Sequence, residues 1–187
     1  MTLRPARRSL FRAGVAAVPL LTAAPALAGQ AVAAPSGEQP GSQALTCAFV
    51  SRWTTAYLEA WRTKDAAAAV RLFAPDALYE AVPGDESQTY RGRDAIGRYW
   101  RDVTSGQSDI GYRQGTPVVT GERAAVEMWV TLRAPAANPD GDHWITLIET
   151  NVLTFGTVGS DRLCTRNSEY WILRTGRHDP PQGWGRA

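Results

Sequence analysis

The sequence predicts an α+β fold, in which three N-terminal helices pack on one face of an antiparallel sheet. Apolar residues recur at helical spacing through the first half of the chain. After residue 108 they alternate with polar residues instead, in runs separated by turn-forming segments. Helices that come first and neighbouring strands that follow are typical of this fold class.

Residues 1–28 have the composition of an export signal. Four arginines and no acidic residue precede an apolar stretch that is too short and too rich in alanine and proline to span a membrane. Ala26 and Ala28 form an A-x-A cleavage site, with a second candidate at residues 31–33. The pair Arg7-Arg8 resembles a twin-arginine signal, and an ordinary secretory signal is the alternative. Both interpretations predict a secreted or extracytoplasmic protein with no membrane attachment after cleavage.

The remaining chain is expected to have three parts. Residues 29–44 are rich in Gly, Ala, Ser, Gln and Pro and predict a flexible leader. Residues 45–174 predict one domain, and residues 175–187 an irregular tail. Removing the four signal arginines from the 20 basic residues of the chain leaves 16 basic against 18 acidic residues. No basic patch is visible, so we expect no nucleic-acid partner.

Three helices are expected in the first half of the domain. Apolar residues at helical spacing predict the first over residues 45–64. Asp65 is a suitable N-cap for the second, which ends at Pro75. A strand over 76–82 and a loop over 83–88 come next, followed by a third helix over 92–103.

Four strands are expected to complete the sheet, over residues 109–119, 123–133, 143–156 and 161–174. Met128 and its apolar neighbours share one face of the second of these strands, and Trp129 lies on the other. Trp144 is expected on the same face as Trp129. Exposed together, these tryptophans would form an apolar patch, which predicts a homodimer that pairs through the sheet.

The strand over 143–156 carries polar residues in the middle of an apolar face. Alternation places Glu149 and Asn151 on the face that also carries Ile145, Leu147, Leu153 and Phe155. A buried acid is unfavourable unless it is partnered, neutralised or facing a cavity. The polar pair therefore marks a candidate site.

The element order and four segments resemble the nuclear transport factor 2-like superfamily, in particular its SnoaL-like and ketosteroid isomerase-like domains. The segments are "YLEAWRTKD" (57–65), "LFAPDALYEAVPG" (72–84), "YRGRDAIGRYW" (90–100) and "RLCTRNSEYW" (162–171). This resemblance spans residues 45–174. It implies that the sheet forms a cone and that the helices pack on its concave side.

The resemblance also implies roles for individual residues. Tyr57 falls at the position of an oxyanion-binding tyrosine, and Asn151 at that of its acid partner. The position of the family's base falls on Ala81, which cannot accept a proton. Glu80 is adjacent, but alternation turns it to the opposite face. Isomerase chemistry with a base at that position is therefore not expected.

Two further polar residues are expected inside the cone. Trp171 matches a pocket-lining position of the family, and alternation from it turns Asn167 and Glu169 inward as well. The catalytic candidates are Glu149, Glu169 and Tyr57, and the ligand-binding candidates are Asn151, Asn167, Trp171, Trp53 and Met128.

Two carboxyl groups in an apolar cone repel each other and shift apart in pKa, which suits proton transfer next to a carbonyl group without a cofactor. Glu149 or Glu169 would be the base, and Tyr57 or Asn151 the donor. In the structural alternative, each carboxyl pairs with Arg133, Arg166 or a backbone end at the rim of the cone.

Cys47 and Cys164 are the two cysteines of the chain. An even count in an exported domain predicts one disulfide bond, with two buried thiols as the alternative. The spacing excludes a CxxC pair, and His143 and His178 leave little for zinc to bind, so no metal site is expected.

Together these features predict an exported domain that binds a small apolar molecule in its cone. Whether it is an enzyme stays open. If it is one, the expected chemistry is that of a cofactor-independent isomerase, cyclase or dehydratase. The alternative is a non-catalytic domain that assembles with itself or with a protein partner.

Overall fold

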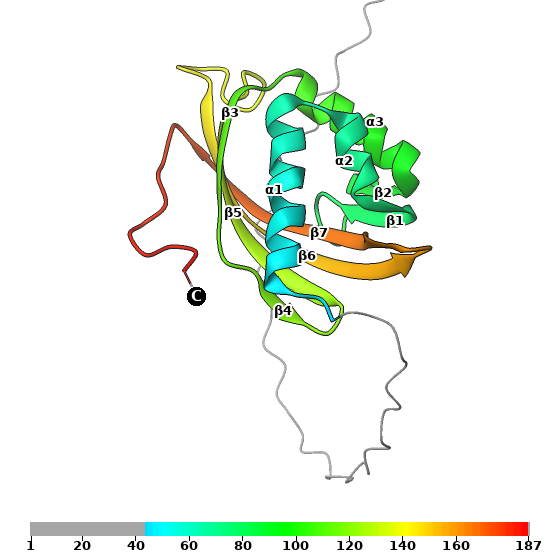
Figure 1. Cartoon of the computed structure of the whole chain (residues 1–187). Helices are drawn as coiled ribbons and strands as arrows, with labels where there is room; N and C mark the ends of the chain where they lie inside the picture. Colours follow the sequence, from blue (N-terminus) through cyan, green and yellow to red (C-terminus); the bar gives the residue numbers. More distant parts are fainter. Residues whose placement is uncertain (1–43, 187) are drawn as a thin grey trace, which may run out of the picture. The chain divides into compact units, whose positions relative to one another are not determined.

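The computed structural model describes residues 44–186 of the chain (Figure 1). The predicted export signal and all but the last residue of the predicted leader lie outside these residues. Within the described part, no helix is both long and apolar enough to cross a membrane.

The three predicted helices are present. Helix α1 (Cys47–Thr63) begins where the side chain of Thr46 accepts a hydrogen bond from the N–H of Phe49, and it ends at Lys64 in the left-handed conformation. Asp65 caps α2 (Ala66–Arg71), and α3 (Gly92–Ser105) follows after the first strands. The second helix is shorter than predicted, because Phe73 already pairs with Cys164 as part of a strand.

Seven strands form a single sheet. They are β1 (Phe73–Glu80), β2 (Thr89–Arg91), β3 (Ser108–Gln114), β4 (Val118–Thr120), β5 (Arg123–Arg133), β6 (Trp144–Val158) and β7 (Asp161–Thr175). Their order is β2-β1-β7-β6-β5-β3, with β4 also paired to β5. Every pair is antiparallel except β1 with β7, which is parallel.

The sequence prediction differs from this sheet at several strands. Strand β1 begins at Phe73, where the expected strand begins at residue 76. No element was expected over residues 89–91, which form strand β2. The strand expected over 109–119 is divided into β3 and β4, because the N–H of Thr116 leaves the sheet ladder and donates to the carbonyl of Gly185 at 2.8 Å.

The helices lie together on one side of the curved sheet, and α1 runs across its concave face (Figure 1). This arrangement confirms the predicted α+β cone. The core lies between the helices and this face, and its wholly buried members include Val50, Leu58, Ile96, Met128 and Val130. The concave face is therefore the inside of the domain.

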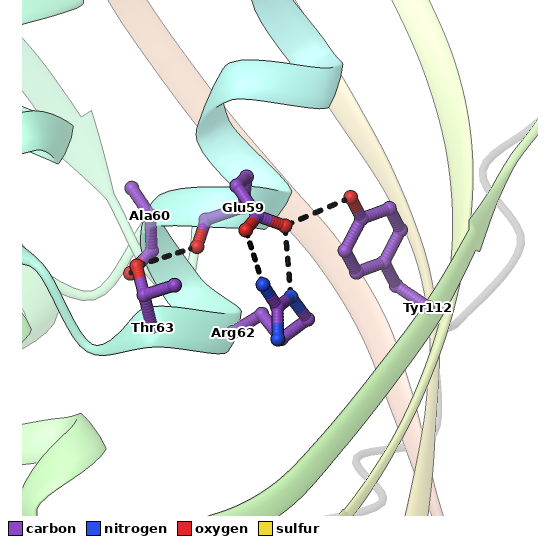
Figure 2. Close-up of polar contacts among 5 residues, drawn as sticks. All are labelled: Glu59, Ala60, Arg62, Thr63 and Tyr112. Carbon is purple, nitrogen blue, oxygen red and sulfur yellow. Dashed lines mark hydrogen bonds and ion pairs between the residues drawn. The ribbon is translucent and has the colours of Figure 1, made fainter.

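The end of α1 is tied to β3 by polar contacts near the surface (Figure 2). Glu59 accepts hydrogen bonds from the guanidinium of Arg62, one turn along the helix, and from the hydroxyl of Tyr112 at 3.3 Å. Thr63 donates back to the carbonyls of Glu59 and Ala60. The carboxylate of Glu59 therefore links α1 to the sheet through β3.

The C-terminal tail covers part of the convex face of the sheet. The indole N–H of Trp129 donates to the carbonyl of His178 at 2.5 Å, and its ring contacts that of Trp184 edge-on at 5.9 Å. Trp129 is consequently only 8% exposed. The prediction of an apolar patch made by Trp129 and Trp144 is wrong, since the chain covers the first itself and the guanidinium of Arg177 lies over the second.

Both cysteines are free thiols, so the predicted disulfide is not formed in the structure. Cys47 is exposed at the start of α1 and donates a weak hydrogen bond to the carbonyl of Pro117 at 3.5 Å. Cys164 is wholly buried in β7 and donates to the carbonyl of Arg166 at 3.2 Å. An even number of cysteines in an exported domain does not by itself place two sulfur atoms within bonding distance. Here the two thiols have different hydrogen-bond partners.

Candidate functional site

Four polar side chains of β6 and β7 lie on the concave face, as alternation predicts. Glu149 and Glu169 are 4% and 6% exposed, and Asn151 and Asn167 are fully buried. In the register of the two strands Asn151 is opposite Glu169, so Glu149 is the diagonal neighbour of Glu169. The sheet therefore holds two carboxyls and two amides inside the core.

Two tyrosines bind one oxygen of Glu169. The hydroxyl of Tyr57, from α1, donates to Oε1 of Glu169, and the hydroxyl of Tyr79, from β1, donates to the same atom at 2.5 Å. The two hydroxyl oxygens are themselves 2.7 Å apart. Asn167 adds a third hydrogen bond to this oxygen through Nδ2 at 3.2 Å. Three elements of the fold thus supply donors to a single carboxyl.

These donors act against the effect of burial on Glu169. Burial raises its pKa above the ordinary value for a glutamate, while the hydrogen bonds from Tyr57, Tyr79 and Asn167 lower it. The amide of Asn151 lies close enough to lower it as well, although it does not meet the geometry of a hydrogen bond. Hydrogen-bond donors stabilise the charged form, so Glu169 is the member of the pair that ionises first.

Glu149 has the opposite environment. Its Oε1 atom is buried without a hydrogen-bond partner. Burial, followed by the neighbouring charge of Glu169, raises the pKa of Glu149 well above the ordinary value. Neither arginine of the structural alternative reaches the pair, because Arg133 lies beside Asp109 and Arg166 binds Glu80. Glu149 is therefore the member of the pair that keeps its proton to the higher pH.

Other polar atoms around the pair also lack partners. Both amide atoms of Asn151 and the Oδ1 atom of Asn167 are buried without a hydrogen bond. Most buried polar atoms in proteins are paired, and leaving one unpaired costs about 1–3 kcal/mol. Together with Oε1 of Glu149, these atoms form a group of unused donors and acceptors on one face of β6 and β7.

Aromatic rings pack against Tyr57, and another is the strand neighbour of Glu149. Trp53 stacks on Tyr57 with ring centroids 5.3 Å apart, and Trp100 meets the same ring edge-on at 5.0 Å. Trp171, opposite Glu149 in the register, donates its indole N–H to the carbonyl of Ala81 at 2.8 Å. Met128 is opposite Glu149 on the other side, in β5. The structure thus brings all the sequence-predicted site residues into one region, apart from the two cysteines.

Sequence reasoning missed Tyr79 as a member of the site. Strand alternation puts it on the same face as Ala81, so a signal was present in the segment 76–82. Glu80 points the other way, as predicted, and binds Arg166 and Ser168. A second missed tyrosine, Tyr99 of α3, packs against Tyr79 at 5.3 Å and has a raised pKa because of its burial.

Two surface cavities lie outside this region. One of about 500 Å³ lies between β3 and the C-terminal tail, and one of about 310 Å³ lies beside α1, α2 and the start of β7. Neither carboxyl lines them, although Trp53 lines the second. Within residues 44–186, no three His, Cys, Asp or Glu side chains are grouped closely enough to hold a metal ion.

Comparison with protein families identifies a SnoaL-like domain over residues 54–159, more than half of the chain. The chain belongs to the SnoaL-like family. The matched range contains α1 from Thr54 onward, Tyr57, Tyr79 and the strand with Glu149 and Asn151. The strand with Glu169 follows it directly.

Solved structures show the same fold. The epoxide hydrolase/cyclase-like enzyme SalBIII, described in pyran ring formation in the polyether salinomycin, matches with a TM-score of 0.53 at 16% identity, covering 67% of this chain and 95% of that one. A ketosteroid isomerase-like protein from Erwinia carotovora atroseptica matches with a TM-score of 0.52 at 20% identity, covering 67% and 95%.

A protein with a ketosteroid isomerase-like fold from Catenulispora acidiphila, in complex with trimethylamine, matches with a TM-score of 0.51 at 18% identity, covering 63% of this chain and 83% of that one. No curated protein matches the sequence. At these identities the solved structures establish the fold of this SnoaL-like domain, and its chemistry has to come from its own residues.

Proposed function

We propose that this SnoaL-like domain binds a small, mainly apolar carbonyl compound inside its cone and transfers a proton next to the carbonyl group without a cofactor. The observation that carries the proposal is the pair Glu149 and Glu169, two buried carboxyls with unequal environments. Donors surround one and none reaches Oε1 of the other. Such a pair supplies a base and an acid at the same pH.

Each carboxyl has a role in this chemistry. Glu169, whose ionised form is stabilised by Tyr57, Tyr79 and Asn167, accepts the proton from the carbon beside the carbonyl. Glu149, kept protonated by burial, donates a hydrogen bond to the carbonyl oxygen as negative charge develops there. Return of the proton to another carbon completes an isomerisation and restores both side chains.

The unpaired amide atoms support ligand binding. A bound polar group that paired with Asn151 and Asn167 would remove the penalty of the buried atoms that now lack partners. Apolar and aromatic walls would hold the rest of the molecule. Because both carboxyls are almost completely buried, entry requires side chains at the edge of the core to move. Tyr90 and Tyr99, half-buried and stacked at 4.3 Å, are suited to this role.

Exchange of protons for deuterium tests the proposal without a known substrate. Cyclic ketones are incubated with the full-length protein in D₂O, and loss of the signals beside the carbonyl is followed by NMR. We expect exchange with the unmodified protein, loss of it in Glu169→Gln and a marked decrease in Glu149→Gln. Glu127→Gln, an exposed change of the same type on β5, is the matched control. Equal rates in all four proteins would contradict the acid–base roles.

A second candidate role, self-assembly, is favoured by one surface feature. Tyr170 and Ile172 of β7 point outward and are 56% and 60% exposed. Ile148 is opposite Ile172 in the register, so the apolar strip continues onto β6. We propose that this strip pairs with a second copy of the chain. Ile172→Glu should then shift a dimer to monomer in analytical ultracentrifugation, whereas Val82→Glu should not. A monomeric unmodified protein would contradict pairing.

We further propose that residues 1–28 direct export, as their basic and apolar segments indicate. Mass spectrometry of the protein recovered outside the cytoplasm of an exporting host tests this. The expected mass is that of a chain cleaved after Ala28 or Ala33. An uncleaved chain retained in the cytoplasm would contradict export.

A further inference from the structure

A cavity of about 310 Å³ lies on the surface between the first half of α1, the end of α2 and the start of β7. Three arginines line it, one from each element: Arg52, Arg71 and Arg162. Its remaining lining is mainly apolar and includes Phe49, Trp53, Leu72 and Leu163. The cavity therefore combines a concentration of positive charge with an apolar surface.

The charge of this cavity is only partly neutralised. Arg162, whose side chain is 13% exposed, forms an ion pair with Glu122 at 3.1 Å. Within the described part of the chain, neither Arg52 nor Arg71 has a carboxylate partner. Two guanidinium groups are thus left to bind an anion. Arginine suits a carboxylate because its planar group forms two parallel hydrogen bonds with it.

The apolar lining indicates what the anion is attached to. Trp53 is largely buried, and its indole N–H already donates to the carbonyl of Leu72 at 3.1 Å. The part of the Trp53 ring that lines the cavity is therefore apolar and has no free donor. Flat aromatic groups pack well against such rings. A fully hydrated anion such as inorganic phosphate would leave this apolar surface unused.

We propose that this cavity binds a small aromatic carboxylate, with Arg52 and Arg71 on the carboxylate group and Trp53 against the aromatic ring. The inference goes beyond the proposed function, because the site does not use the carboxyl pair of the cone. Trp53 and Tyr57, stacked at 5.3 Å, separate the cavity from Glu169. Trp53 is thus shared between the cavity and the wall of the interior.

Calorimetric titration of the full-length protein with 2-naphthoate and with its neutral isostere 2-naphthamide tests the site. We expect saturable binding of the carboxylate at one site and binding of the amide at least about tenfold weaker, because a charge-assisted contact is lost. Higher salt should weaken the carboxylate alone. The indole N–H signal of Trp53 in a nitrogen-edited NMR spectrum should shift on binding.

Variants locate the site. The double variant Arg52→Gln/Arg71→Gln should bind 2-naphthoate at least about tenfold more weakly. Arg98→Gln, an exposed arginine on α3 with no ion pair within residues 44–186, is the matched control and should bind normally. Thermal unfolding of each variant serves to check that it is folded.

Several results would overturn the inference. They are equal binding of acid and amide, unchanged affinity in the double variant, and no saturable binding at millimolar 2-naphthoate. If inorganic phosphate competed with 2-naphthoate at the same affinity, the site would bind simple anions, and the inference of an aromatic carboxylate ligand would be wrong. Glu149→Gln should leave naphthoate binding unchanged, so this test and that of the proton-transfer site can fail separately.

Discussion

The substitution Glu149→Gln should change how the stability of the domain depends on pH. The side chain is 4% exposed, its Oε1 atom has no partner, and burial raises its pKa well above the ordinary value. The proton is therefore bound more tightly in the folded domain than in the unfolded chain. Glutamine has nearly the same shape and cannot titrate, so it reproduces the neutral acid at every pH.

The sign and size of the effect follow from this difference. The stabilisation that the protonated Glu149 provides is fully present below the pKa of an unfolded glutamate, about 4.3. It is lost as the pH rises toward the higher pKa of the folded domain. Over that range the free energy of unfolding falls by about 1.4 kcal/mol per pH unit for this one group. The variant lacks this loss and becomes progressively more stable than the unmodified protein toward neutral pH.

Urea unfolding followed by tryptophan fluorescence, from about pH 5 to about pH 8, measures the difference. Glu127→Gln is the control, because Glu127 is exposed and has no ion pair within the described residues. Its difference from the unmodified protein should not grow with pH. A Glu149→Gln difference that is constant over this range would refute the conclusion that Glu149 keeps its proton to a higher pH in the fold.

Three further predictions concern other parts of the domain. Tyr57→Phe removes a donor to Glu169 and should destabilise the domain by about 1–3 kcal/mol in urea unfolding, where equal stability would contradict the role of this bond. Cys47 should react with Ellman's reagent in the native protein, and Cys164 only after unfolding, because burial raises the pKa of its thiol. No reactive thiol and a mass lower by two protons would instead show a disulfide. Removal of residues 177–187 should expose Trp129, which a red shift of fluorescence and a lower Tm would report, and an unchanged spectrum would contradict its coverage by the tail.

The concave face could be predicted because its pattern is local. Apolar neighbours at every second position decide which face of β6 is buried, and they predict that Glu149 and Asn151 point inward. For Glu169 the family resemblance of Trp171 was needed as well, with alternation counted from that residue. The helices follow from equally local signals, such as the N-cap Asp65. These residues were found without any knowledge of their partners.

The contacts that give the site its chemistry are long-range and could not be found this way. Tyr79 is 90 residues from Glu169 along the chain, and the parallel pairing of β1 with β7 brings them together. The cover over Trp129 comes from a tail whose Pro, Gly and polar residues predict no regular element. Local patterns determine which face is buried, whereas the register between distant strands determines which polar groups meet there.

The two carboxyls of this domain lie on different strands from the base of an isomerase that has its base at the end of the first strand. Position 81 is alanine, and its carbonyl is bound by the indole of Trp171. The candidate acid and base instead come from β6 and β7, where they are diagonal neighbours in a continuous antiparallel ladder. Such neighbours have Cα atoms about 7–8 Å apart, close enough for both side chains to reach one small group between them. The backbone hydrogen bonds of the sheet thus fix the spacing of the pair. We therefore expect a reaction here to depend on which ligand enters the cone, because the ladder leaves the acid and the base little freedom to rearrange.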